Sequence, residues 1–202
     1  IVGKYPDIRL RRVRNSDWVR RLVSENNLSS NDFILPIFVT EGKNKIHEIK
    51  SMPNVFRYSV DKLDGIVSKA EKSGIPMIAL FPHTDNKKKD KKGTEALNEN
   101  NLICKSIRKI KNKFKKIGVM CDVALDPYTS HGHDGILKNQ EVLNDETIKI
   151  LEQQAILQAQ MGCDVIAPSD MMDGRIKKIR NKLDQENFQN VQIISYAVKY
   201  AS

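Results

Sequence analysis

Residues 33–39 read Phe33-Ile34-Leu35-Pro36-Ile37-Phe38-Val39, a short run that is entirely apolar. A run of this length without polar alternation is typical of a strand buried on both faces of a parallel sheet. Segments with helical periodicity separate this run from later ones, and such alternation predicts repeated βα units. Four further runs of the same kind are Met77 to Phe81, Ile117 to Leu125, Asp164 to Ala167 and Val191 to Ala197.

Helix start and stop signals surround the segments between these runs. Ser59 is placed to cap one helix, and Gly74 to end it in the left-handed conformation. Asn144 or Asp145 is placed to cap a later helix, which Gly162 closes. The apolar positions of the four predicted helices are Leu63, Ile66, Val67 and Ala70; Ile103, Ile107, Ile110 and Phe114; Ile148, Leu151, Ala155 and Ala159; and Ile176, Ile179 and Leu183.

Five strands in one parallel order fit either a doubly wound sheet or part of a (β/α)8 barrel, and periodicity does not separate the two. No G-x-G-x-x-G or P-loop motif follows any of the strands, which argues against a nucleotide-binding open sheet. Ligands bind at the carboxyl ends of the strands in both architectures. The chemistry is therefore expected at those ends.

Composition narrows the class of protein. The chain has 202 residues, 40% of them hydrophobic, which is enough for an aliphatic core. A net charge of +9 admits a polyanionic partner. The basic runs Arg9 to Arg14, Lys87 to Lys92 and Lys105 to Lys116 lack interleaved aromatic residues, which favours solvated faces over a nucleic-acid site. No apolar stretch approaches the roughly 18 residues that a membrane span needs.

The cysteines and the chain ends give weaker indications. Cys104, Cys121 and Cys163 lie far apart without C-x-x-C spacing, which indicates reduced core thiols of a cytosolic protein. The chain begins at Ile1 and ends at Ser202 without start or stop signals, so we expect both ends to continue. A targeting peptide would precede Ile1.

The third apolar run leads into residues 122–135, DVALDPYTSHGHDG, which are dense in ionisable groups. Asp122, Asp126 and Asp134, together with His131 and His133, have the donor types that bind Mg²⁺ or hold an ammonium group. Turn capping by the aspartates explains the same residues equally well. Residue types alone leave both interpretations open.

Two more strand ends carry candidate residues. Ser169 could hydrogen-bond a substrate and Asp173 could pair with Arg175, although Ser or Asp before a helix is ordinarily an N-cap, and capping is the favoured interpretation. Lys199 follows the fifth run. A lysine there is either a surface residue, which residue type alone favours, or an amine desolvated enough to attack a ketone and form an imine.

The segments around these residues resemble the porphobilinogen synthases, also called 5-aminolevulinate dehydratases. The likeness rests on Asp122 to Gly135, Ala167 to Arg175 and Tyr196 to Ser202, in this order and spacing. It extends to Arg9 to Arg14, Phe33 to Gly42, Ser51 to Arg57 and Leu80 to Pro82, so it covers nearly the whole chain.

The resemblance implies a (β/α)8 barrel, incomplete here at about five βα units over residues 32–202, with an N-terminal arm over residues 1–31. It implies a lyase that condenses two 5-aminolevulinate molecules, through lysine Schiff bases and with loss of water, to porphobilinogen in tetrapyrrole and heme synthesis. Lys199 matches one Schiff-base lysine, while the second lies on a later strand. Asp122 matches a position near the substrate amine, and Ser169 one near the lysines.

Metal use and assembly are likewise implied by the resemblance. Zinc-dependent members carry three cysteines where this chain has Ala124, Asp126 and Asp134, so catalytic Zn²⁺ is not expected. The chain is similar to the aspartate-rich branch that uses Mg²⁺ or a monovalent cation, with Asp126 and Asp134 as candidate ligands and an allosteric Mg²⁺ site built by later residues. The arm implies a homo-octamer in the cytoplasm, with no nucleic-acid or membrane partner.

Two alternatives remain from the residues alone. A Schiff-base aldolase with a single lysine would share Lys199 but leave the aspartate-rich loop unexplained. A basic module that binds nucleic acid or a protein partner would use Lys87 to Lys92 and the arm. Five strands cannot close a barrel, so we expect residues 1–202 by themselves to be inactive and poorly soluble.

Overall fold

The computed structural model of the chain describes residues 3–200, so Ile1, Val2, Ala201 and Ser202, at the ends of the predicted arm and of the last family motif, lie outside it. Its central element is a seven-stranded sheet in the order β2-β3-β1-β4-β5-β8-β9. Neighbouring strands run parallel except β2 and β3. The strands are β1 (Ile34–Thr40), β2 (Ile46–Glu48), β3 (Phe56–Ser59), β4 (Met77–His83), β5 (Gly118–Val123), β8 (Val165–Pro168) and β9 (Gln192–Ile193).

The five predicted strands are β1, β4, β5, β8 and β9, and they lie side by side in chain order. A doubly wound sheet would reverse its strand order at a switch point, whereas a (β/α)8 barrel adds each strand next to the one before it. The sheet therefore has the topology of an incomplete barrel, as expected. A small separate ladder joins β6 (Leu137–Lys138) to β7 (Glu141–Val142).

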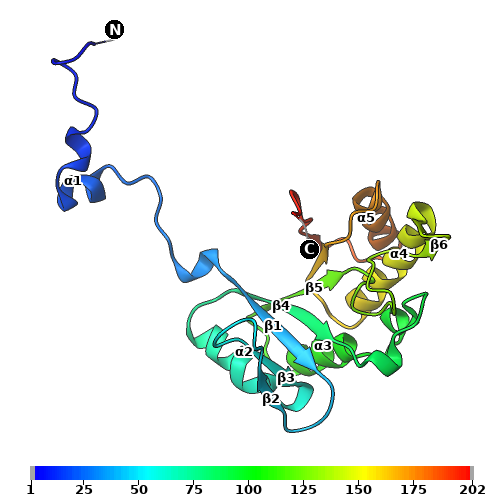
Figure 1. Cartoon of the computed structure of the whole chain (residues 1–202). Helices are drawn as coiled ribbons and strands as arrows, with labels where there is room; N and C mark the ends of the chain where they lie inside the picture. Colours follow the sequence, from blue (N-terminus) through cyan, green and yellow to red (C-terminus); the bar gives the residue numbers. More distant parts are fainter. Residues whose placement is uncertain (1–2, 201–202) are drawn as a thin grey trace.

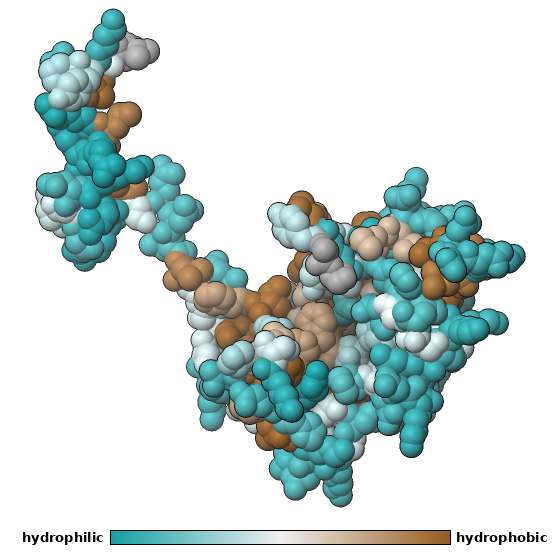
Figure 2. Space-filling view, viewed as in Figure 1, coloured by the Kyte–Doolittle hydropathy of each residue, from teal (hydrophilic) through white to brown (hydrophobic). Residues whose placement is uncertain are grey.

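Four helices cover one face of the sheet (Figure 1). They are α2 (Leu63–Lys72), α3 (Leu102–Lys113), α4 (Asn144–Gln160) and α5 (Arg175–Gln185). The predicted apolar stripes form the main core against the sheet, in which Leu63, Ile107, Leu151 and Leu183 are fully buried. The opposite face carries a smaller apolar cluster formed by Ala79, Met120, Val165 and Ala167. In Figure 2 apolar side chains gather in the hollow beside the C-terminal segment.

The predicted helix ends are right and the predicted caps are wrong. Gly74 and Gly162 have φ of +74° and +101°, the left-handed conformation that glycine adopts without steric cost. Ser59 instead precedes a short 3-10 turn, η3 (Val60–Lys62), and its hydroxyl donates to Asp61 rather than accepting from the helix. α4 begins at Asn144 itself, after Leu143, without a side-chain cap.

Two features of the sheet differ from the prediction. The hairpin of β2 and β3 was not predicted, because its strands are short, polar and half-exposed, and they lack the apolar run that marks the others. β9 is two residues long rather than the predicted seven. Beyond it the amides of Ile194 and Tyr196 still donate to Ile166 and Pro168, at 3.0 and 3.4 Å, but the outer edge has no partner strand to complete a ladder.

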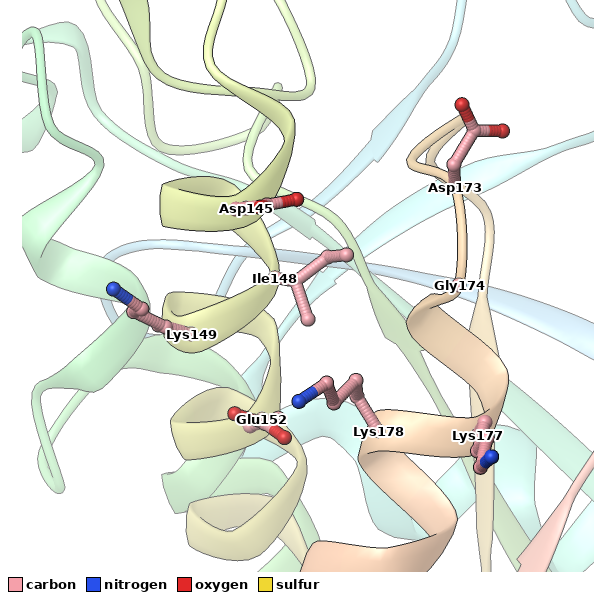
Figure 3. Close-up of a pocket in the computed structure, with 8 residues that line it drawn as sticks. All are labelled: Asp145, Ile148, Lys149, Glu152, Asp173, Gly174, Lys177 and Lys178. Carbon is pink, nitrogen blue, oxygen red and sulfur yellow. The ribbon is translucent and has the colours of Figure 1, made fainter.

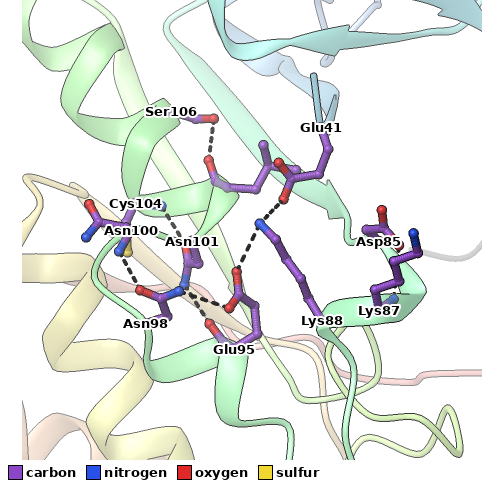
Figure 4. A network of polar contacts seen from close by, with 11 residues as sticks. Glu41, Asp85, Lys87, Lys88, Glu95, Asn98, Asn100, Asn101, Cys104 and Ser106 are labelled. Atoms are coloured by element: carbon purple, nitrogen blue, oxygen red, sulfur yellow. Dashed lines mark hydrogen bonds and ion pairs between the residues drawn. The ribbon is translucent and has the colours of Figure 1, made fainter. Parts of the chain in front are cut away.

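The loop between β4 and α3 is tied to β1 by charged and amide side chains (Figure 4). The Nζ of Lys88 lies 2.6 Å from Glu41 and 3.6 Å from Glu95. Asn101 caps α3 by accepting from the amide of Cys104 at 2.8 Å, and its side-chain nitrogen donates to the carbonyl of Glu95 at 3.2 Å. One lysine of the basic run at residues 87–92, Lys88, therefore forms ion pairs within the fold. The other lysines of the run are exposed or half-buried.

The N-terminal segment extends away from the sheet (Figure 1). It holds a 3-10 turn, η1 (Arg12–Arg14), and α1 (Asp17–Leu22), neither of which buries a residue. A second 3-10 turn, η2 (Ser30–Asp32), leads into β1. The large apolar side chains of the N-terminal segment are exposed, among them Leu10, Trp18, Leu22 and Leu28 at 84%, 63%, 77% and 78%.

Two smaller expectations can be checked in the described chain. Cys104, Cys121 and Cys163 are buried free thiols, as predicted. Among residues 3–200, no helix combines the length and apolarity that crossing a bilayer requires.

Candidate active site

A cavity of about 500 Å³ opens at the carboxyl ends of the parallel strands. Side chains alternate between the two faces of a strand, so Asp122 lies on the same face as Met120, and Ser169 on the same face as Ala167. Because that face is opposite the helices, it corresponds to the interior of a barrel. The cavity is lined by Phe81, Asp122, Asp126, Ser169 and residues 196–199.

Lys199 reaches this cavity from the segment that follows β9. Its Nζ donates a hydrogen bond of 2.5 Å to the main-chain oxygen of Ser169 and lies 3.8 Å from Oδ2 of Asp134. The side chain is 30% exposed, so the amine can be approached from the cavity. The preceding residue, Val198, has φ of +54°, a conformation that is strained for a β-branched residue. Such strain is found where a backbone is held for function.

Asp122 is the carboxylate whose properties are changed most by the site. Burial raises its pKa to about 7, from an ordinary value of 3.8. A hydrogen bond from the Ser169 side chain and the charge of Lys199 lower the pKa, while Asp126 raises it. Gln158 of α4 fixes the strand at this point, because its Nε2 donates to the main-chain oxygen of Asp122 at 2.9 Å. A carboxyl group with a pKa near 7 can both give and accept a proton at neutral pH.

Asp126 and Asp134 lie on the loop that follows β5. Burial raises the pKa of Asp126, and the charge of Lys199 opposes that shift. Oδ2 of Asp134 is buried without a hydrogen-bond partner in the described chain, and Lys199 is its ion-pair partner. The histidines of the same loop do not line the cavity; His131 meets Lys91 and the amide of His133.

The described residues do not bring three protein ligands for a metal together at this loop. Nowhere within residues 3–200 do three His, Cys, Asp or Glu side chains come together as ligands. Asp126 and Asp134 are instead arranged around the amine of Lys199. Mg²⁺ is commonly held by one or two carboxylates, with water completing its octahedral coordination, so Asp126 and Asp134 stay candidate ligands.

The sequence analysis missed Asp170 and its pairing with Arg175. Arg175 does not pair with Asp173 as suggested; its Nε lies 3.0 Å from Oδ1 of Asp170, whose side chain is fully buried. Burial raises the pKa of Asp170 to about 6. The capping interpretation is also wrong, since Gly174 precedes α5 without a side-chain cap. The sequence pattern could not predict this pair, because Asp170 and Arg175 are separated by an irregular turn rather than spaced along one helix or strand. The turn reverses at Gly174, which has φ of +79°.

A second cavity, of about 390 Å³, lies between α4 and α5, away from the strand ends (Figure 3). Its lysines and carboxylates come from the exposed sides of the two helices. It is lined by Asp145, Ile148, Lys149, Glu152, Asp173, Gly174, Lys177 and Lys178. We refer to it below as the helix groove.

Fold and site together define an α/β-barrel protein with a lysine amine held among buried carboxylates at the strand ends. Residues 7–202 match the family described as Delta-aminolevulinic acid dehydratase. The chain belongs to this family.

Relatives of known name support the same assignment. A Delta-aminolevulinic acid dehydratase of Bradyrhizobium diazoefficiens is 54% identical over 195 residues, which cover 96% of this chain and 55% of that protein. A chloroplastic Delta-aminolevulinic acid dehydratase of Chlamydomonas reinhardtii is 46% identical over 196 residues, covering 96% and 50%.

A solved structure extends the likeness to three dimensions. The Toxoplasma gondii enzyme, a delta-aminolevulinic acid dehydratase (porphobilinogen synthase) crystallised with porphobilinogen, is 40% identical and superposes with a TM-score of 0.92 over 96% of this chain and 56% of that one. The fold class predicted from sequence is thereby confirmed. The chain spans a little over half the length of that structure and of the Bradyrhizobium relative.

Proposed function

We propose that this chain supplies one of two Schiff-base lysines, Lys199, to a porphobilinogen synthase that condenses two molecules of 5-aminolevulinate. The observation that carries the proposal is the amine itself. It lies at the strand ends beside Ser169 and Asp134, on the wall of a cavity of about 500 Å³ that is large enough for small keto acids. Membership of the Delta-aminolevulinic acid dehydratase family supports the interpretation of this amine as a Schiff-base lysine.

The chemistry that we propose for Lys199 is imine formation. The neutral amine attacks the ketone carbon of aminolevulinate, and the carbonyl oxygen leaves as water after taking up two protons. One of these comes from the amine nitrogen and the other from a nearby acid, so the product is the protonated imine, which keeps the second proton of the amine on its nitrogen. Asp122, with a pKa of about 7 and on the same cavity wall, suits the transfer of such protons at neutral pH. Ser169, which lines the same cavity as Asp122, would orient the bound keto acid.

Asp126 and Asp134 would hold cations of the reaction rather than a metal. A carboxylate beside an ammonium group stabilises its charge, and both groups already face the Lys199 amine. The substrate also carries an ammonium group, which these carboxylates could bind. A Mg²⁺ or monovalent cation requirement stays a prediction for the whole enzyme, and we propose that it does not act through Asp126 and Asp134 alone.

Assembly is the second part of the proposal. Residues 1–31 would form an arm and residues 32–202 part of the catalytic barrel. The arm exposes Leu10, Trp18 and Leu22, and an apolar surface of this kind is stable in water only when it is covered. A second copy of the chain is the proposed cover, in a homo-octamer. The proposed location is the cytoplasm, although the Chlamydomonas relative is chloroplastic.

The test is to treat the full-length protein with 5-aminolevulinate and borohydride and to map the reduced adduct by mass spectrometry. We expect label on Lys199 and porphobilinogen in the unreduced reaction. Lys178 of the helix groove is the control and should carry no label. Label on Lys199 without porphobilinogen would favour a single-lysine aldolase, and product formation without label at Lys199 would refute the assignment.

A further inference from the structure

The carbonyl that accepts the hydrogen bond from the Lys199 amine belongs to a peptide group next to a buried, ion-paired aspartate. Lys199 Nζ donates at 2.5 Å to the oxygen of Ser169, and that oxygen is part of the peptide that links Ser169 to Asp170. The direction of this carbonyl therefore depends on how Asp170 is held. Asp170 is 1% exposed, directly beneath the cavity wall.

Asp170 is held from two sides within one short turn. Its Oδ2 accepts from the amide of Met172 at 2.9 Å, and its Oδ1 lies 3.0 Å from Nε of Arg175. Arg175 also donates from Nη1 to the carbonyl of Met172 at 3.0 Å. Asp170 therefore binds the amide of Met172 and Arg175 binds its carbonyl. These two contacts close the turn over residues 170–175.

Within the described chain, Oδ1 of Asp170 and Nε of Arg175 are compensated mainly by each other. Oδ1 of Asp170 and Nε of Arg175 are buried and accept or donate no well-aligned hydrogen bond in the described chain, so each depends on the other for compensation. Removing one partner of such a pair leaves an uncompensated buried charge, which the turn can relieve only by moving. The carbonyl of Ser169 would move with it.

The remaining contacts of the turn lie on its far side. Asn144 of α4 accepts from the amide of Asp173 at 2.7 Å and donates to its carbonyl at 3.2 Å. On the strand side, the amide of Ser169 donates to Val123 at 3.2 Å. Between these two attachments, Asp170 and Arg175 form the buried ion pair of the turn, whereas the third charged side chain, Asp173, is exposed.

We propose that Asp170 and Arg175 are positioning residues for Lys199: their buried ion pair fixes the Ser169–Asp170 peptide so that its carbonyl aims the lysine amine into the cavity. This inference rests on the proposed imine chemistry for its effect on catalysis. The geometry of the turn and of the free amine stands independently of that chemistry. Neither residue touches the reacting atoms.

The test compares variants of the full-length protein in single-turnover imine trapping with 5-aminolevulinate and borohydride. In Arg175→Met, the rate constant for trapping at Lys199 should fall at least tenfold, with the half-saturating substrate concentration within twofold of the parent value. Arg175→Lys keeps the cation and should recover part of the loss. Lys182→Met is the matched control, because Lys182 forms an exposed pair with Glu186 on the same helix, at 2.6 Å, and should leave the rate unchanged.

Rate constant and amplitude separate positioning from simple stabilisation. A purely structural role would lower the amplitude, through loss of folded protein, and leave the rate constant of the folded fraction intact. Asp170→Asn keeps an acceptor for the Met172 amide and serves if Arg175→Met does not fold; it should also slow trapping. Rate constants within twofold of the parent in Asp170→Asn, or in a folded Arg175→Met, would overturn the proposal.

A substrate-free measurement keeps this inference distinct from the proposed function. Competitive acetylation by acetic anhydride should modify Lys199 several-fold faster, relative to Lys178, in Asp170→Asn or Arg175→Met than in the parent, because the amine is released from the Ser169 carbonyl. If the parent forms no aminolevulinate adduct but this acetylation ratio changes, the proposed function fails and the positioning role stands. An unchanged ratio in folded variants would remove the positioning role.

Discussion

The strand-end cavity and the helix groove both combine lysines with aspartates, yet they differ in how those groups are held. In the groove, Lys177 and Lys178 of α5 and Asp173 of the turn before it are exposed side chains. At the strand ends, Asp122 of the cavity and Asp170, next to Ser169, are withdrawn from water, and burial raises their pKa values to about 7 and about 6. Charge content alone therefore does not mark the site.

Burial matters because water screens the exposed groups and not the buried ones. Exposed ion pairs contribute little and keep ordinary protonation behaviour, whereas a buried carboxylate interacts strongly with any neighbouring charge. The Lys199 side chain is 30% exposed, but its amine lies 3.8 Å from Oδ2 of Asp134, whose side chain is only 12% exposed. Matched substitutions in the two cavities test whether this difference, and not residue type, decides function.

The largest effect is expected for the two lysines. Lys199→Met in the full-length protein should lower porphobilinogen formation by at least about a thousandfold, since an imine cannot form without the amine. Lys178→Met in the helix groove should leave the rate within twofold. Product assay with both variants checks the pair. Activity retained by Lys199→Met would end the proposal, whatever the groove variant does.

The next effect is expected for Asp122. Asp122→Asn should lower the rate by about 10²–10⁴, the usual loss for a proton-transfer group. The parent rate should also fall as pH rises through about 7, because the carboxyl then loses the proton that it donates, and Asp122→Asn should lack that limb. Asp145→Asn, in the helix groove, is the control and should keep the parent profile. A parent profile that is flat between pH 6 and 8 would contradict this role.

Asp122 should also leave a signature in stability. Because burial raises its pKa from 3.8 to about 7, the folded state holds this proton more tightly than the unfolded state does. The carboxyl therefore destabilises the fold increasingly as pH rises from about 4 to about 7, by at most about 4 kcal/mol at 1.36 kcal/mol per pKa unit. Asp122→Asn should gain stability over the parent at pH 8 and not at pH 4, as denaturant unfolding would measure.

A smaller effect is expected for Gln158, which supports the site from α4. Gln158→Leu removes the 2.9 Å hydrogen bond to the Asp122 carbonyl, worth about 0.5–1.5 kcal/mol, so the rate should fall about 2- to 10-fold. Gln153→Leu changes an exposed residue of the same helix and is the matched control. Equal rates for the two variants would show that α4 does not orient Asp122.

The smallest effect is expected from zinc removal. Ala124, Asp126 and Asp134 offer no thiolate to Zn²⁺, so a zinc-selective chelator should leave activity of the full-length protein within twofold. Added Mg²⁺ should raise activity if the predicted dependence holds. Strong zinc dependence, restored by zinc and not by Mg²⁺, would contradict the argument from the missing thiolates.

Much of the scaffold could be predicted from sequence. The apolar runs at residues 33–39 and 77–81 identified β1 and β4, and the stripe from Ile103 to Phe114 identified α3, because burial demands a regular pattern of apolar residues. The hairpin of β2 and β3 gave no such signal. β3 is held in the sheet by its parallel pairing with β1, and β2 pairs only with β3 in the described sheet, so neither strand needs a long apolar run.

The site divides in the same way. The sequence by itself determined which chemical groups end the strands, and family resemblance directed attention to Lys199, Asp122 and Ser169, all of which line one cavity. Only the tertiary structure decided that Arg175 pairs with Asp170 and not with Asp173, and that Asp134 faces the amine of Lys199. Local pattern records what each segment must bury, whereas charge partners are chosen by distance and desolvation, which exist only once the segments have packed.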